Sequence, residues 1–167
     1  FNQYPSQDEM KKFGEELLKY IRENKITNFV IDLRQNYGGD FFVGISLAYY
    51  LNLADSIDWE KGTYVLVDNV TFSAATTNAT QFKQILNAKV VGEPTGSNPS
   101  GYQDMGQFEL PNSKLTITYS KRLFRIQEKL GAALEPDVII HYNWEEYLRG
   151  NDNMLEWILN DLRGNNP

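Results

Sequence analysis

The 167-residue sequence lacks cysteine altogether and contains a single histidine, His141. The lack of cysteine excludes disulfide bonds, thiolate nucleophiles and zinc sites built on cysteine ligands. One histidine is too few for a histidine-rich zinc site within this chain. The sequence also has no apolar stretch of about 18 residues, so it predicts no membrane-spanning segment. These absences exclude cysteine-based sites and histidine-rich zinc sites within this chain, and no segment of it is expected to span a membrane.

The charge of the sequence is weakly acidic, with 22 acidic against 16 basic residues and a formal net charge of −6. No run of five or more like charges occurs. A nucleic-acid surface needs a basic patch, so we expect no nucleic-acid partner. The apolar fraction is 41% and the charged fraction 23%, values that are typical of an ordered globular protein. The length suffices for one domain with its own core, and no linker divides it, so we expect a single domain over residues 1–167.

Short apolar runs, typical of buried strands, alternate along the chain with segments whose apolar residues recur at helical spacing. This alternation predicts an α/β fold. We expect buried strands near residues 28–33, 63–68, 89–91 and 137–140, and helices at 41–53, 73–87 and 151–163. Ser6 and Glu9 form a capping-box pattern ahead of apolar residues at helical spacing, so a further helix is expected to begin there. The segment 41–53 is apolar on most faces and is therefore expected to be well buried.

A hairpin is expected inside this α/β pattern. Its two arms are residues 108–110 and 115–119, joined around Pro111-Asn112-Ser113. In the second arm, apolar and polar side chains alternate, which predicts a half-buried strand. The hairpin therefore adds an antiparallel pair to largely parallel strands.

The loop after the first strand, Asp32 to Asp40, is the first candidate site, because sites in open α/β sheets form beyond the carboxyl ends of strands. Gly38 and Gly39 allow a sharp turn and can offer backbone N–H groups to an anion. The alternative is a tight structural turn in which Asp32 and Arg34 form an ion pair. The spacing G-x-G-x-x-G is absent, so the loop is not a dinucleotide-binding fingerprint.

The loop after the second strand places Ser73 at the mouth of a helix. A hydroxyl there could act as a nucleophile, with the Ala74 N–H and the helix dipole receiving an oxyanion. The alternative is that Ser73 is an ordinary helix N-cap. The G-x-S-x-G elbow of α/β-hydrolases is absent.

Six segments occur in an order that resembles the C-terminal-processing (tail-specific) serine peptidases, whose relatives include tricorn protease and the retinoid-binding repeats. These segments are Asp32-Leu33-Arg34-Gln35-Asn36-Tyr37-Gly38-Gly39, Thr71-Phe72-Ser73-Ala74-Ala75, Val91-Gly92-Glu93-Pro94-Thr95-Gly96, Leu110-Pro111-Asn112-Ser113, Glu135-Pro136-Asp137-Val138 and Gly150-Asn151-Asp152. They are spread in this order across nearly the whole chain.

This resemblance implies a crotonase/Clp-protease-like core of stacked strand–helix units with the added antiparallel hairpin. It implies that Ser73 is a nucleophile, and that the N–H groups of Ala74 and of Gly38 or Gly39 form an oxyanion hole. It also implies that Glu128 is an orienting residue. The implied substrate is a peptide or protein, and the implied reaction needs no metal or cofactor. A bacterial cell-envelope or extracellular location is implied as well.

The sequence departs from the family at the general base. Tail-specific members carry a lysine in the loop where this chain has Asn98, and a neutral amide cannot accept a proton from serine. Lys83 and Lys89 do not match that position and are interpreted as a solvated helix residue and a strand-start charge. His141 is interpreted as a surface or interface histidine, and Glu93 as a solvated carboxylate.

The missing lysine favours the tricorn-like branch, whose histidine comes from a segment before the first strand. We therefore expect N-terminal segments beyond these residues in the full-length protein, and a poor peptidase without them.

Two other function classes compete with a peptidase. The first is a catalytically inactive, peptidase-like module that binds a peptide or a small apolar ligand. The second is a crotonase-type acyl-CoA enzyme, which would leave the Ser73 segment without a purpose. The presence or absence of an upstream histidine in the full-length sequence would separate the peptidase from the binding module.

Overall fold

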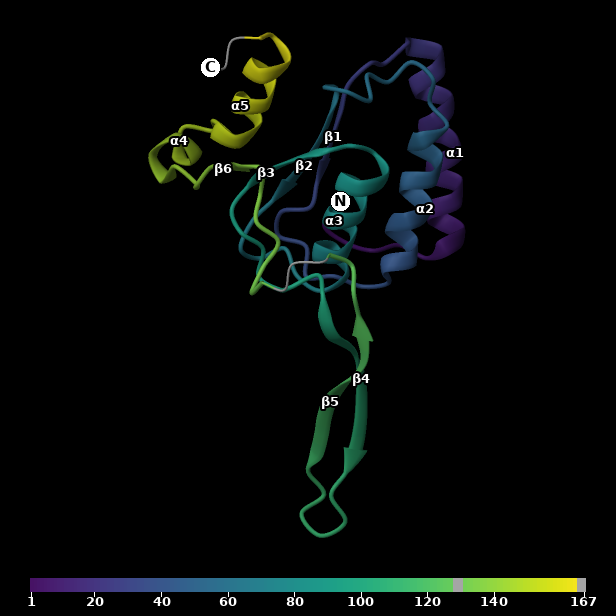
Figure 1. Ribbon diagram of the computed structural model, residues 1–167, viewed down its shortest axis with the longest axis vertical. Coiled ribbons are helices and arrows are strands. Elements are labelled where there is room, and N and C mark those ends of the chain that lie inside the picture. The colour runs from purple at the N-terminus through teal and green to yellow at the C-terminus, as the bar shows by residue number, and fades with distance from the viewer. Residues whose placement is uncertain (128–130, 165–167) are drawn as a thin grey trace.

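The computed structural model describes residues 1–127 and 131–164. Its centre is a parallel sheet with the strand order β1-β2-β3-β6 (Figure 1). The strands are β1 (Phe29–Asp32), β2 (Thr63–Val67), β3 (Lys89–Gly92) and β6 (Val138–Ile139). The register pairs Phe29 with Thr63, Tyr64 with Lys89, and Val91 with Val138. The four strands expected from the apolar runs are thus confirmed as members of one sheet.

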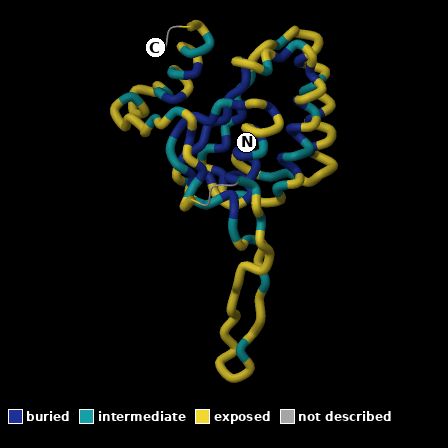
Figure 2. Tube along the Cα trace, viewed as in Figure 1, coloured by how far each residue is buried: buried dark blue, intermediate teal, exposed yellow. Residues whose placement is uncertain are grey.

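Helices cover both faces of this sheet. They are α1 (Gln7–Asn24), α2 (Phe41–Asn52), α3 (Ala74–Ile85), α4 (Trp144–Leu148) and α5 (Asn153–Leu162). On β2, Val65 and Val67 face the cluster that contains α1, α2 and α3, whereas Tyr64 and Leu66 face α5. The strand is therefore buried on both sides, and Figure 2 shows the buried residues concentrated in this part of the molecule. Within the described part of the chain, no helix is long and apolar enough to cross a membrane.

The helix starts follow their local sequences. At α1 the Ser6 hydroxyl accepts from the Glu9 N–H, and the Glu9 carboxylate accepts from the Ser6 N–H, so the capping box is confirmed. The expectation that the segment 41–53 is buried on most faces is wrong for part of α2. Phe42 and Tyr49 are more than half exposed, because α2 packs against α1 and α3 and leaves one side open to solvent.

The antiparallel pair is longer than expected and projects from the body as a two-stranded ribbon (Figure 1). It consists of β4 (Gly101–Glu109) and β5 (Thr116–Phe124). The second arm was expected to be half-buried, and this is wrong, because Leu115 and Tyr119 are exposed. The alternation correctly indicates an apolar face on the ribbon, but no other described element covers that face.

Candidate active site

The loop that follows β1 carries Gly38 and Gly39, and the loop that follows β2 carries Ser73. The two loops meet at the carboxyl ends of these strands. The Phe72 N–H donates to the Asn36 carbonyl at 2.9 Å, which ties one loop to the other. Gly38 has a φ of +99°, and a Cβ placed there would lie 2.8 Å from Ser73 Cβ and 2.9 Å from Ala74 N. A side chain at this position would clash, so the close approach of the two loops depends on glycine.

Ser73 stands immediately before α3 in a strained conformation. Its φ of 52° and ψ of −120° lie outside the regions that L-residues ordinarily adopt, and its side chain makes no capping hydrogen bond. The N-cap alternative is therefore wrong. Ser73 stands at the N-cap position of α3, but its side chain does not cap the helix, and its positive φ resembles the strained strand-to-helix turn of nucleophile elbows.

The backbone N–H groups around Ser73 divide into two kinds. The Gly38 N–H donates to Asn36 Oδ1 at 2.8 Å, and the Ser73 N–H donates to Ser97 Oγ at 2.8 Å. The N–H groups of Gly39 and Ala74 donate to no acceptor in the described part of the chain. Of the two glycines expected to serve an oxyanion, Gly39 therefore has the free donor, and Gly38 supplies the close approach.

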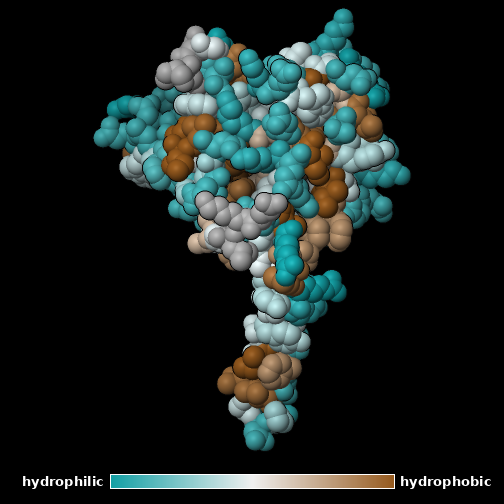
Figure 3. Space-filling model, in the orientation of Figure 1, coloured by the Kyte–Doolittle hydropathy of each residue, from teal (hydrophilic) through white to brown (hydrophobic). Residues whose placement is uncertain are grey.

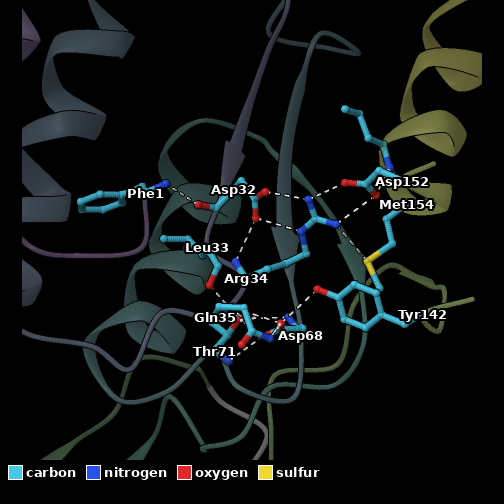
Figure 4. A network of polar contacts seen from close by, with 11 residues as sticks. Phe1, Asp32, Leu33, Arg34, Gln35, Asp68, Thr71, Tyr142, Asp152 and Met154 are labelled. Carbon is cyan, nitrogen blue, oxygen red and sulfur yellow. Dashed lines mark hydrogen bonds and ion pairs between the residues drawn. The ribbon is translucent and has the colours of Figure 1, made fainter. Parts of the chain in front are cut away.

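Buried Asp68 accepts hydrogen bonds from both loops (Figure 4). Its carboxylate accepts from the Gln35 N–H at 3.2 Å on the first loop, and from the Thr71 N–H at 2.9 Å on the second. Tyr142 also donates its hydroxyl to Asp68 at 3.2 Å. Burial, followed by the Asp68 charge, raises the pKa of Tyr142 to about 12, so this phenol stays a donor at neutral pH. Sequence analysis missed Asp68, although a carboxylate directly after a fully buried strand was a usable signal.

Arg34 links the first loop to the C-terminal part of the chain. Its guanidinium lies 2.7 Å from Asp32 and 2.7 Å from Asp152, so two of the six sequence segments meet here (Figure 4). The ion pair expected between Asp32 and Arg34 is confirmed. Burial alone would lower the pKa of Arg34, but the hydrogen bonds and charges of the two carboxylates raise it overall. The guanidinium is therefore a permanently charged structural link.

A cavity of about 590 Å³ opens beside the glycine turn. It is lined by residues 2–5 on one side and by Gln35 and residues 37–40 on the other. Tyr4 anchors the first wall, because its hydroxyl donates to Asn78 Oδ1 of α3 at 2.6 Å. A larger cavity of about 910 Å³ lies between α1 and β1 and does not include the glycine turn or Ser73. The smaller cavity thus adjoins the glycine turn, and Ser73 is not among its lining residues.

The residues considered for the general base are each bonded to groups other than Ser73. Asn98 Oδ1 accepts from the Ser100 N–H at 2.8 Å, in a local turn. Lys83 is ion-paired with Asp137. The interpretation of Lys83 as merely solvated is therefore incomplete.

Lys89 is likewise held in an ion pair, with Nζ 2.6 Å from the carboxylate of Asp161. Its interpretation as a simple strand-start charge is incomplete for the same reason. Neither lysine is an unpaired amine beside Ser73.

His141 is exposed, as expected, and its Nδ1 lies 3.0 Å from Glu93 Oε1. Glu93 was expected to be solvated, but its side chain is only 13% exposed because it packs against His141 and the backbone of Tyr142. Glu128 lies outside the described residues. Among the described residues there is no group of three or more side chains of the kinds that bind metals.

Comparison with known proteins identifies the family of the chain. The model of peptidase family S41 matches residues 48–140, a span that includes Ser73 and the loop after β3. The chain belongs to the S41 family of serine peptidases. In a search of curated proteins, no match was found.

Solved structures share the fold at low sequence identity. A Bacteroides fragilis protein assigned as an S41 protease has a TM-score of 0.61 and 18% identity, over 93% of this chain and 50% of its own. A Parabacteroides merdae protein assigned as a peptidase has a TM-score of 0.63 and 14% identity, over 95% of this chain and 57% of its own. Tricorn protease has a TM-score of 0.55 and 15% identity, over 90% of this chain and 19% of its own. This chain therefore spans about half the length of the first two proteins, and a smaller part of tricorn protease.

Proposed function

We propose that the chain is the catalytic core of a serine peptidase in which Ser73 is the nucleophile. The observation that carries the proposal is the strained Ser73, whose side chain makes no capping hydrogen bond, next to the Ala74 N–H and close to the Gly38-Gly39 turn. Membership of the S41 family supports the same reaction class. The substrate is a peptide or protein, bound along the edge where the loops after β1 and β2 meet.

In the proposed reaction, Ser73 Oγ attacks the carbonyl carbon of a peptide bond and loses its proton to a general base. The carbonyl oxygen becomes an oxyanion that accepts hydrogen bonds from the N–H groups of Ala74 and Gly39. The amine leaves with a proton, and water then hydrolyses the acyl-enzyme to release the acid and restore Ser73. Loss of one oxyanion donor typically costs about 3 kcal/mol of transition-state stabilisation, so the spacing of Ala74 and Gly39 matters.

We propose that the general base comes from a segment of the full-length protein outside residues 1–167. Asn98 has no basic group, and His141, whose Nδ1 contacts Glu93, makes no hydrogen bond to Ser73 within the described part of the chain. We keep Glu128 as a proposed orienting residue on the resemblance of its segment alone. The same absence of a base in contact with Ser73, within the described part of the chain, favours one second candidate. This is an inactive peptidase-like module that binds a peptide or a small apolar ligand.

The finer fold and location are part of the proposal. We propose that the sheet, its helices and the ribbon form a single crotonase/Clp-protease-like core. We further propose a tail-specific or tricorn-like type of peptidase located in the cell envelope or outside the cell, on the resemblance of the sequence motifs. No metal or cofactor takes part in the proposed reaction.

The nucleophile is tested by labelling with a fluorophosphonate probe in the natural full-length polypeptide that carries these residues. Ser73→Ala should abolish labelling and leave the thermal unfolding curve close to that of the wild type. Ser120→Ala, an exposed serine on β5, is the matched control and should label normally. Equal labelling of Ser73→Ala and wild type would reject the nucleophile, and an unlabelled wild type would favour the binding module.

The origin of the base is tested by comparing peptidase rates of the 167-residue chain and of the natural full-length polypeptide. General-base assistance is worth roughly 10²–10⁴ in rate, so we expect the shorter form to be slower by that order. Equal and robust rates would place the base inside this chain and contradict the proposal.

A further inference from the structure

A hydroxyl from the loop after β3 holds the backbone of Ser73. The Ser73 N–H donates to Ser97 Oγ at 2.8 Å, and the Ser97 hydroxyl donates to Thr76 Oγ1 at 3.0 Å. Thr76 in turn donates to the Thr71 carbonyl at 3.0 Å. Each hydroxyl in this relay passes its one hydrogen onward and accepts one from the preceding group. The relay begins at the Ser73 N–H and ends at the Thr71 carbonyl, which lie on the same turn. Ser97 belongs to another loop and therefore joins the two ends of this turn through hydrogen bonds.

The segment that supplies Ser97 is itself fixed against the same turn. The Gly96 N–H donates to the Thr71 carbonyl at 2.9 Å, one residue before Ser97. Thr95 Oγ1 donates to the Ser97 carbonyl at 2.8 Å and accepts from the Leu134 N–H at 2.9 Å. Ser97 therefore approaches Ser73 from an anchored loop and not from a free one.

The conformation of Ser73 explains why such a contact matters. A positive φ is unfavourable for a residue with a Cβ and persists only where surrounding contacts fix it. The Ser97 hydroxyl oxygen also accepts the hydrogen bond that the Ser73 N–H donates. The neighbouring Ala74 N–H then remains as the donor of this turn that has no acceptor in the described part of the chain.

We infer that Ser97 is a positioning residue of the peptidase site. It keeps the Ser73 backbone in its left-handed conformation, aims the Ser73 hydroxyl away from α3, and leaves the Ala74 N–H for the oxyanion. This inference rests on the proposed function, because it assigns to Ser97 an effect on the reactivity of Ser73.

The test measures inactivation by the fluorophosphonate probe in the natural full-length polypeptide, as kinact and KI separately. Ser97→Ala should lower kinact by about 10- to 100-fold with little change in KI, because misplacing a reacting group by about 1 Å costs on the order of 100-fold. Ser97→Thr retains the hydroxyl and should restore most of kinact. The melting temperature should be similar in all variants, and Ser120→Ala should behave as the wild type.

The outcomes separate this inference from the proposed function. If Ser73→Ala abolishes labelling and Ser97→Ala labels at the wild-type rate, Ser97 has no positioning role and the nucleophile stands. A lowered kinact that Ser97→Thr does not restore, accompanied by a lowered melting temperature, indicates a purely structural role and overturns the inference. Labelling that survives Ser73→Ala overturns the proposed function, and the inference with it.

Discussion

At the residue scale, Gly38 is the position where the two loops of the candidate site approach each other closely. Its φ of +99° is unfavourable for other residues, and an added Cβ would lie 2.8 Å from both the Phe72 carbonyl oxygen and Ser73 Cβ. Gly38→Ala should therefore destabilise the fold by about 1–3 kcal/mol and slow fluorophosphonate labelling of Ser73, because the two loops must separate. Chemical denaturation and labelling kinetics measure these two effects.

The matched control for that substitution is Gly131→Ala. Among the described residues, the nearest atom to an added Cβ there would be the Ala133 carbonyl oxygen at 3.5 Å, an ordinary van der Waals contact. Its stability should stay within about 0.5 kcal/mol of the wild type. Gly38→Ala with unchanged stability and labelling would mean that the loops do not need this close approach.

Sequence motifs led to Ser73, Gly38 and Gly39, because short loops after buried strands converge at one edge of a parallel sheet. Motifs could not show which glycine N–H is already used, since that depends on the rotamer of Asn36. They also missed Asp68 and Ser97, whose partners lie on loops distant in sequence. Side chains that position others by hydrogen bonds resemble ordinary polar loop residues until the loops are placed in space.

At the element scale, the ribbon is the part of the fold that stands most apart. Its apolar side chains pack mainly on each other, as where Phe108 and Tyr119 lie with ring centroids 6.3 Å apart. Figure 3 shows an apolar patch near its tip. The sequence correctly predicted an antiparallel pair here. It could not predict the exposure, because an alternating pattern specifies an apolar face and not the layer that covers it.

Shortening the ribbon tests whether the sheet needs it. Replacing residues 104–121 with Asn-Gly joins Gln103 to Arg122, which lie opposite each other, through a two-residue hairpin turn. We expect the melting temperature to change by no more than about 4 °C, equivalent to about 1 kcal/mol, because the removed residues contact mainly one another. Loss of cooperative unfolding in differential scanning calorimetry would show that the ribbon supports the core.

At the scale of the whole molecule, Arg34 joins the sheet to α5 through Asp152. Burial alone would raise the pKa of Asp152, but hydrogen bonds from Arg34 and the Leu155 N–H, with the Arg34 charge, lower it overall. The folded state therefore binds this proton more weakly than the unfolded state. The resulting stability is present above the unfolded pKa, near 4, and is lost as the pH falls through the folded pKa.

Asp152→Asn should remove that contribution. Thermal unfolding between pH 2 and pH 7 should show a smaller loss of stability on acidification in the variant than in the wild type. The control is Asp55→Asn, an exposed carboxylate without an ion pair among the described residues. Identical acid profiles for Asp152→Asn and the wild type would contradict the role of this link.

The parallel order of the sheet also bears on how the chain folds. Val91 must find Val138 across a long stretch of sequence, whereas the ribbon closes locally and brings Gly101 next to Phe124. Hairpins form within about 1–10 μs, well before distant parallel strands pair. Early closure of the ribbon would roughly halve the effective length of the loop between β3 and β6. By polymer arguments this lowers the entropy cost of joining these strands by about 0.6 kcal/mol, so the ribbon would accelerate docking of the last strand.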